Sequence, residues 1–134
     1  MKPYTRLINT IEMQVALPSE INSAVNLCHG LAKEAGWWDG ANTASPDFIP
    51  AKLCLIHSEV SEAMEGARKN LMDDHLPERP MLEVELADAV IRIMDLAGGL
   101  NLDLGGAIAD KLLYNTERAD HKPENRAKYN GKVF

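Results

Sequence analysis

Apolar residues recur every three or four positions along four segments of the chain, a period typical of amphipathic α-helices. The predicted helices cover about residues 20–35, 50–69, 80–97 and 104–119. Ser19 precedes the first helix as a candidate N-cap, and Gly36 follows it as a candidate left-handed stop. Four helices joined by short links predict an all-α fold, a helical bundle of four main helices.

The length of the chain bounds its organisation. With 134 residues it suits one domain, residues 1–134, with a core of about residues 20–120. Residues 1–18 are a mixed, partly helical lead-in, and residues 121–134 are a polar tail. Between the first two helices the segment WWDGANTASPDFIP is rich in turn-forming residues, and a loop this long in a small domain is often functional.

Composition narrows the class of protein. Hydrophobic residues make up 46% of the chain but aromatic residues only 5%, which is typical of a helical core built from aliphatic side chains. The net charge of −6 at pH 7 gives no basic surface for duplex nucleic acid or an anionic membrane. No apolar run approaches the ~20 residues of a membrane-spanning helix, and residues 1–18 lack the apolar stretch of a signal peptide. These features predict a cytoplasmic protein in which Cys28 and Cys54 are reduced core residues.

The second predicted helix carries two stripes of residues that differ in character. Its apolar positions share one face, and a more polar stripe lies roughly 110° from that face. The apolar face consists of Leu53, Ile56, Val60, Ala63 and Ala67, and the neighbouring stripe consists of Lys52, Glu59, Glu62 and Gly66. The two glutamates of this stripe are therefore predicted to flank the core.

The third predicted helix is apolar over most of its circumference, so it is predicted to be buried on most sides. Its narrow polar strip consists of Glu85, Asp88, Arg92 and Asp95. In one interpretation the strip is a solvent face on which Arg92 pairs with Asp88 or Asp95. In the other it faces Glu59 and Glu62, and four carboxylates hold a divalent metal, Mg²⁺ or Mn²⁺. A di-iron bundle is excluded, because no Glu is followed by a His three residues later.

The fourth predicted helix has a stripe of two cations and an amide. Lys111, Asn115 and Arg118 recur at i, i+4 and i+7. Alone, such a stripe is an ordinary solvated face. Next to an acidic cluster that holds metal it becomes a phosphate clamp, because Lys and Arg offset the charge of a polyphosphate.

Taken in order, these motifs resemble those of the MazG-like all-α nucleoside triphosphate pyrophosphatases. The family pattern of Glu-x-x-Glu, a spacer and Glu-x-x-Asp is matched by EVSE and ELAD, and its Lys-x-x-x-Asn-x-x-Arg by KLLYNTER. The resemblance implies hydrolysis of a nucleoside or deoxynucleoside triphosphate to the monophosphate and pyrophosphate, in nucleotide-pool control. Mg²⁺, with Mn²⁺ as a substitute, would be held by the catalytic carboxylates Glu59, Glu62, Glu85 and Asp88. Phosphates would be contacted by Lys111, Asn115 and Arg118, with Lys52 as a further candidate.

The resemblance also implies a place for the nucleobase. In pyrimidine-selective relatives a His on the first helix and a Trp about nine residues later help to form the base pocket, and His29 and Trp38 have this spacing. The alternative is a core histidine with aromatic packing under the loop. Because Trp37 and Trp38 are hard to bury together, at least one of them is predicted to stack on a base or a partner subunit.

The sequence also predicts that the chain forms an oligomer, and it leaves one alternative to an enzyme. A third helix that is apolar all round needs more cover than a small monomer provides, and the resemblance likewise implies a homodimer or homotetramer with sites near the subunit interface. The rival to the enzyme is a non-catalytic helical interaction module whose acidic strips are solvated faces.

Overall fold

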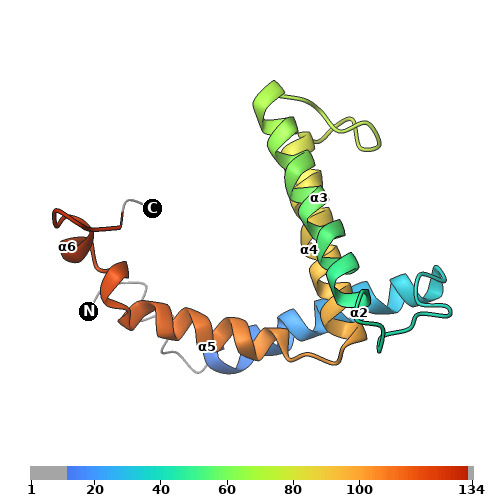
Figure 1. The fold of residues 1–134 in the computed structure, drawn as a ribbon, viewed down its shortest axis with the longest axis horizontal. Coiled ribbons are helices and arrows are strands. Elements are labelled where there is room, and N and C mark those ends of the chain that lie inside the picture. Colours follow the sequence, from blue (N-terminus) through green and yellow to red (C-terminus); the bar gives the residue numbers. More distant parts are fainter. Residues whose placement is uncertain (1–11, 133–134) are drawn as a thin grey trace. The chain divides into compact units, whose positions relative to one another are not determined.

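A computed structural model of the chain describes residues 12–132, and it is helical over most of that range (Figure 1). The elements in chain order are a π-helical turn η1 (Glu12–Ala16), α2 (Leu17–Glu34), α3 (Phe48–Lys69), α4 (Met81–Gly99), α5 (Leu104–Glu117), a 3₁₀ turn η2 (Ala119–His121) and α6 (Pro123–Arg126). Within residues 12–132 the only β-type pairing is an isolated bridge between Met72 and Pro80. The predicted all-α fold is confirmed for this part of the chain. Most of the predicted lead-in lies outside the described residues.

The four predicted helices correspond to α2, α3, α4 and α5, with small differences at their ends. The prediction that Ser19 caps the first helix is wrong, because η1 continues directly into α2 at Leu17. Ser19 instead lies inside the helix, where its carbonyl accepts a hydrogen bond from the Ser23 hydroxyl at 2.8 Å. Gly36 has the predicted left-handed conformation, with φ of 81°.

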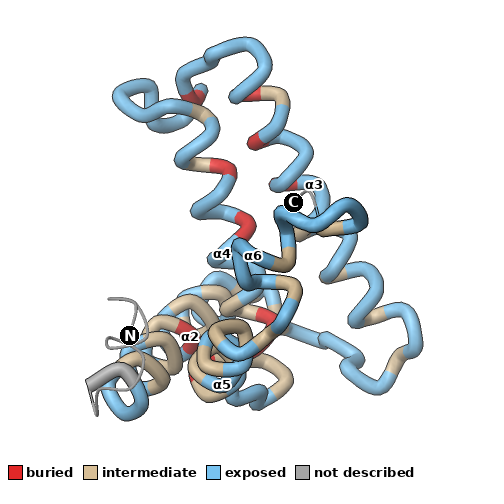
Figure 2. The backbone as a smooth tube through the Cα atoms, turned by 90° about the vertical axis from the view of Figure 1, so that its left-hand side faces the viewer, coloured by how far each residue is buried: buried red, intermediate tan, exposed pale blue. Residues whose placement is uncertain are grey.

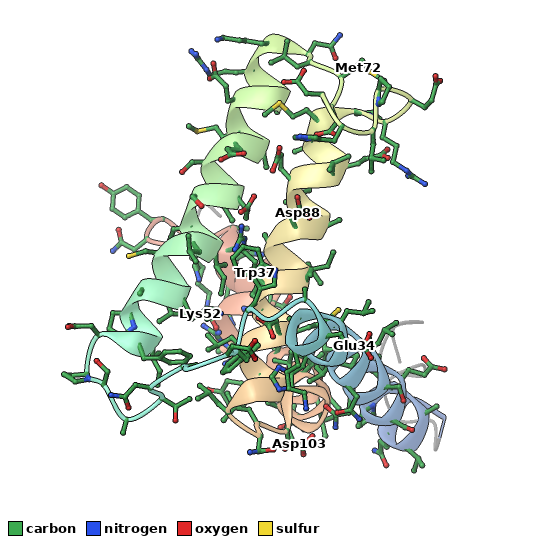
Figure 3. The ribbon with its side chains drawn as sticks, turned by 90° about the vertical axis from the view of Figure 1, so that its right-hand side faces the viewer. Glu34, Trp37, Lys52, Met72, Asp88 and Asp103 are labelled. Atoms are coloured by element: carbon green, nitrogen blue, oxygen red, sulfur yellow. The ribbon has the colours of Figure 1, made fainter. Side chains whose placement is uncertain are left out.

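Helices α3 and α4 pack side by side as a helical hairpin (Figure 1). Asn70 ends α3 in a left-handed conformation, and its backbone N–H bonds back to carbonyls of the last turn. The loop that follows is held by Asp73, a buried residue whose Oδ1 accepts hydrogen bonds from the backbone N–H groups of His75 and Leu76 at 3.0 and 2.6 Å. Backbone hydrogen bonds from the N–H of Asp73 to the carbonyl of Arg79 and from the N–H of Met81 to the carbonyl of Leu71 close the hairpin, with Met72 in the loop at its end (Figure 3).

Small residues set the contact between α3 and α4. A Cβ placed on Gly66 would lie 2.9 Å from Cβ of Met81, so the two helices meet more closely there than a side chain would allow. Ala63 of α3 and Ala89 of α4 are also buried. Figure 2 shows that buried positions are few and spread along both helices.

The face of α3 that packs on α4 coincides only in part with the predicted apolar face. Leu53 and Val60 belong to that predicted face but are 45% and 50% exposed. The packed side contains Ala63 of the predicted apolar face together with Glu59 and Gly66 of the neighbouring stripe, all of which are buried. The reason is steric, since the close approach at Gly66 requires small neighbours, and large residues turn outward.

Two further expectations about burial are wrong for the described chain. The predicted burial of the third helix on most sides does not hold, because α4 exposes several large apolar residues: Leu82, Leu86, Val90, Ile91 and Ile93. Cys54 is exposed and is not a core residue, whereas Cys28 is half-buried; both thiols are free. In each case the single chain has too few neighbouring elements to cover the surface that the sequence pattern marks as apolar.

Gly66→Ala is expected to lower the free energy of unfolding by about 1–3 kcal/mol, because the added methyl group overlaps Met81 and the backbone nitrogen of Leu82. Urea denaturation followed by circular dichroism measures this change. Gly30→Ala on α2 is the matched control, since nothing lies within 4 Å of its Cβ position. The control is expected to raise stability by about 0.5–1 kcal/mol. Equal effects of the two substitutions would contradict the close helix contact.

The described chain divides into two compact units. One contains Ala24–Leu102, with most of α2 and the α3–α4 hairpin, and the other contains the described residues 12–23 and 103–132. In the second unit Asn22 joins the start of α2 to the start of α5. Its Nδ2 donates to Asp103 Oδ1 at 2.8 Å, and its Oδ1 accepts from the N–H of Gly105 at 2.9 Å. The prediction that both units form one domain stays a prediction.

None of the described helices is long and apolar enough to cross a membrane.

Candidate metal centre

Three of the four predicted metal ligands come together between α3 and α4. Glu59 of α3 and Glu85 and Asp88 of α4 each offer a carboxylate oxygen, and these oxygens all lie within 4.8 Å of one another. Glu59 and Glu85 are each only 7% exposed. Asp88, which is labelled on α4 in Figure 3, is more accessible. We call these three residues the carboxylate cluster. A cluster of this kind could hold a metal ion, because carboxylate oxygens are the ligands that hard divalent cations prefer.

Glu62, the fourth predicted ligand, lies outside this tight group and is exposed. It is one turn further along α3 than Glu59. Its negative charge nevertheless contributes to the environment of Glu85, as the pKa of that residue shows. Glu62 therefore lies at the edge of the carboxylate cluster.

The carboxylate cluster concentrates more negative charge than its surroundings accommodate. Burial is the largest of the effects that raise the pKa of Glu85 from 4.5 to about 7. The charge of Glu62 comes next, followed by the hydrogen bond that protonated Glu85 donates to Glu59 and by the charges of Glu59 and Asp88. A carboxyl that keeps its proton near neutral pH marks a place where a cation would relieve repulsion.

Arg92 offsets part of the negative charge of the carboxylate cluster. Its Nε donates to Oε1 of Glu59 at 2.6 Å, across the two helices. The interpretation of the strip as a solvent face, on which Arg92 pairs with Asp88 or Asp95, is therefore wrong about the partner of Arg92. It is also wrong about the exposure of Glu85, which is buried. Two members of the polar strip instead have oppositely charged partners on α3, Glu59 for Arg92 and Lys52 for Asp95.

The raised pKa of Glu85 makes the stability of the metal-free protein depend on pH. Between about pH 4.5 and 7 the folded chain holds a proton that the unfolded chain has lost. The free energy of unfolding is therefore expected to fall as pH rises through this range. Urea denaturation at several pH values in the presence of a chelator measures this slope. Glu85→Gln is expected to flatten it, whereas Glu83→Gln, at an exposed position on α4, is expected to leave it unchanged. An unchanged slope in Glu85→Gln would show that this carboxyl does not carry the proton.

A second group of side chains gathers around Asp95, further along the same polar strip. Oδ1 of Asp95 accepts hydrogen bonds from Nδ1 of His29 at 2.9 Å and from Nε1 of Trp38 at 2.7 Å. Oδ2 lies 3.7 Å from Nζ of Lys52. We call these four residues the Asp95 cluster. It brings together His29, Trp38 and Lys52, all three of which the sequence marked as candidates for binding substrate.

The rings of this cluster pack on one another. His29 meets Trp38 edge to face with centroids 4.8 Å apart, and Phe48 lies 5.6 Å from Trp38 on another side. Nζ of Lys52 lies over the indole at 4.7 Å, within the range of a cation–π interaction. Trp37 is different, because it is 76% exposed. Of the two adjacent tryptophans, Trp37 is therefore the one left uncovered.

The stripe on α5 belongs to the other compact unit, so the structure does not join it to the carboxylate cluster within one unit. Arg118 makes a paired contact with Asp120, with Nε at 2.9 Å from Oδ1 and Nη2 at 2.5 Å from Oδ2. Lys111 places Nζ over the ring of Tyr114 at 4.6 Å. The side-chain oxygen of Asn115 is buried, and no described residue bonds to it.

The sequence pattern did not mark Phe48, which packs on Trp38 of the Asp95 cluster, or the contacts of Asp95 itself. Phe48 was hidden in a turn-rich segment with no motif around it. Asp95 was recognised only as one member of a strip, and its contacts reach residues 57 and 66 positions away in the chain. A signal was present, since Asp95 is the one carboxylate of the strip that no metal motif uses.

Comparison of the chain with protein-family models, with curated proteins and with solved structures gives no match.

Proposed function

We propose that this chain is a MazG-like nucleoside triphosphate pyrophosphohydrolase that needs Mg²⁺, with Mn²⁺ as a substitute. The observation that carries the proposal is the carboxylate cluster, in which two helices bring three carboxylates within 4.8 Å of one another. The raised pKa of Glu85 supports a cation as the missing partner, because crowded carboxylates without one retain a proton. Oxygen donors of this kind suit Mg²⁺ and Mn²⁺ better than softer metals.

In this proposal Glu59, Glu85 and Asp88 hold the metal, with Glu62 at the edge of the site. The bound metal supplies charge neutralisation for the phosphates and lowers the pKa of water. Water bonds to one of the two phosphorus atoms that flank the α–β bridge, and the bond from that phosphorus to the bridging oxygen breaks. The products are the nucleoside monophosphate and pyrophosphate. Arg92 offsets the charge of Glu59 when no metal is bound.

The remaining candidates contact the substrate. Lys52 lies on the same helix as Glu59 and is the cation of the Asp95 cluster, so it is available to a phosphate or to the base. On the family pattern, Lys111, Asn115 and Arg118 contact phosphates, for which Arg118 must exchange its pairing with Asp120. His29, Trp37 and Trp38 face the base. The substrate is a ribo- or deoxyribonucleoside triphosphate.

We further propose that the protein is a homodimer or homotetramer. The large apolar residues left exposed on α3 and α4 support this, since extended apolar surface on a small protein favours association. Light scattering at micromolar concentration is expected to give a multiple of the chain mass, and a monomeric mass would count against it. The same exposed residues also favour the rival function, a helical interaction module without catalysis.

Assay of pyrophosphate release from a panel of nucleoside triphosphates separates the enzyme from the interaction module. The enzyme requires release from at least one nucleotide in the presence of Mg²⁺ and loss of release with a chelator.

A further inference from the structure

Asp95 contacts three of the candidate substrate-binding residues with its two carboxylate oxygens. Its side chain is 14% exposed and meets groups from three separate segments: His29 of α2, Trp38 of the link between α2 and α3, and Lys52 of α3. One oxygen, Oδ1, takes both of the ring N–H groups. The rings are therefore oriented by a single atom.

Helix α4 is shaped to receive these two rings. A Cβ on Gly98 would lie 2.5 Å from Cβ of His29, and a Cβ on Gly99 would lie 2.0 Å from Cη2 of Trp38. Consecutive glycines at the end of α4 thus leave the room that the imidazole and the indole occupy. A residue with a side chain at either position would displace the ring that Asp95 holds.

The contact with Asp95 also determines which ring nitrogen of His29 carries the proton. A carboxylate only accepts hydrogen bonds, so Nδ1 of His29 carries the proton in this contact. Nε2 is then the ring nitrogen left to meet another molecule. Without Asp95, the imidazole could rotate or exchange the proton between its nitrogens.

The position of Asp95 relative to the carboxylate cluster suits one extended substrate. Asp95 follows Asp88 by seven residues on α4, and Lys52 precedes Glu59 by seven residues on α3, about 10.5 Å along each helix. Because α3 and α4 form a hairpin, these two shifts run in the same direction, which agrees with the contact between Lys52 and Asp95. The Asp95 cluster therefore lies two helical turns from the carboxylate cluster along the hairpin. A nucleoside triphosphate has its base and its phosphates at opposite ends, so one substrate molecule could contact both clusters.

We propose that Asp95 is the positioning residue of the base site: it orients His29 and Trp38 through one oxygen and restrains Lys52 with the other, and so sets the affinity and ranking of nucleobases. This inference rests on the proposed function. Asp95 does not touch the reacting phosphates in this account, so its loss affects KM and the choice of base more than kcat.

The test compares Asp95→Ala and Asp95→Asn with Asp74→Asn, a control that removes the same charge at an exposed loop position. Steady-state kinetics with several nucleotides gives KM and kcat, and near-ultraviolet circular dichroism reports the order of the indoles. Asp95→Ala is expected to raise KM about 10- to 100-fold for every nucleotide, to narrow the differences between bases and to weaken the indole bands, with kcat within about threefold of wild type.

Asp95→Asn separates positioning from simple loss of structure. Its amide oxygen can still accept from both rings, but as a neutral acceptor it binds them more weakly and no longer attracts Lys52. The indole bands are expected to return, and KM is expected to rise only about threefold to tenfold. If Asp95→Ala does not fold, the KM of Asp95→Asn decides the matter.

Two results would overturn the inference. The first is that both Asp95 variants keep the KM, the base ranking and the indole bands of the wild-type protein. The second is that the control Asp74→Asn changes KM as much as the Asp95 variants do. A parallel titration of tryptophan emission with a non-hydrolysable α,β-imido nucleotide distinguishes this failure from failure of the proposed function. If the wild-type protein neither binds this analogue nor releases pyrophosphate, the proposed function fails and the inference falls with it. If the wild-type protein does both and the Asp95 variants match it, only the inference fails.

Discussion

Asp88→Asn is expected to lower pyrophosphate release by roughly a thousandfold or more while leaving the helical fold intact, because it removes a charged metal ligand from the carboxylate cluster. The same loss is expected for Glu62→Gln if the edge carboxylate also takes part in binding. Neither change should unfold the protein, since each relieves repulsion around Glu85. The measurement is kcat with a responsive nucleotide at saturating Mg²⁺, beside circular dichroism at 222 nm.

Glu83→Gln is the matched control for these variants. Glu83 lies on the same helix but is exposed and pairs with Arg79, away from the carboxylate cluster. It is expected to retain wild-type kcat. Thermal denaturation with and without Mn²⁺ adds a readout that needs no turnover, because metal should stabilise wild-type protein and the control but not Asp88→Asn. Full activity in Asp88→Asn would remove the carboxylate cluster from the mechanism.

Trp38→Ala is expected to raise KM for good and poor nucleotides alike by about 10- to 100-fold, with a smaller change in kcat, because stacking on an indole is worth about 1–3 kcal/mol and does not select between bases. The structure adds a second reason, since the indole also holds the edge of His29 and the ammonium of Lys52. A change at His29, by contrast, is expected to alter the ranking of nucleotides.

Trp37→Ala is the natural comparison, because Trp37 is the adjacent tryptophan and is 76% exposed. It is expected to leave the indole bands of Trp38 intact. A larger rise in KM for Trp37→Ala than for Trp38→Ala would move base stacking to the exposed ring. Unchanged KM in Trp38→Ala for every nucleotide would show that the base does not sit on this side chain.

Helix content could be predicted from the sequence because its determinants are local. The three-to-four-residue period located α2, α3, α4 and α5, and Gly36 was correctly expected to be left-handed. The start of α2 was missed because residues before Ser19 continue the helix, and no capping signal marks where a π-helical turn joins it.

The orientation of α3 could not be predicted in the same way. Two stripes about 110° apart compete to face α4, and hydrophobicity alone favours the one that contains Leu53 and Val60. Close packing at Gly66 favours a face between the two, on which Ala63 from the first stripe is buried beside Glu59 from the second. That preference depends on the partner helix, so it is absent from any single helical pattern.

The candidate site shows the same division between local and long-range information. The Glu-x-x-Glu and Glu-x-x-Asp spacings placed Glu59 near Glu85 and Asp88 correctly. The partner of Arg92 was sought one turn away on its own helix but lies across the hairpin. The three contacts of Asp95 join α4 to segments that only the folded chain brings close.

Pyrophosphate release by the purified wild-type protein decides between a hydrolase and a helical interaction module. The protein is incubated with each common ribo- and deoxyribonucleoside triphosphate in Mg²⁺, and pyrophosphate and monophosphate are quantified. We expect equimolar pyrophosphate and monophosphate from at least one nucleotide, with release abolished by chelator and restored by Mg²⁺ or Mn²⁺. Absence of pyrophosphate from every nucleotide with either metal would contradict this expectation and would leave the helical interaction module as the function.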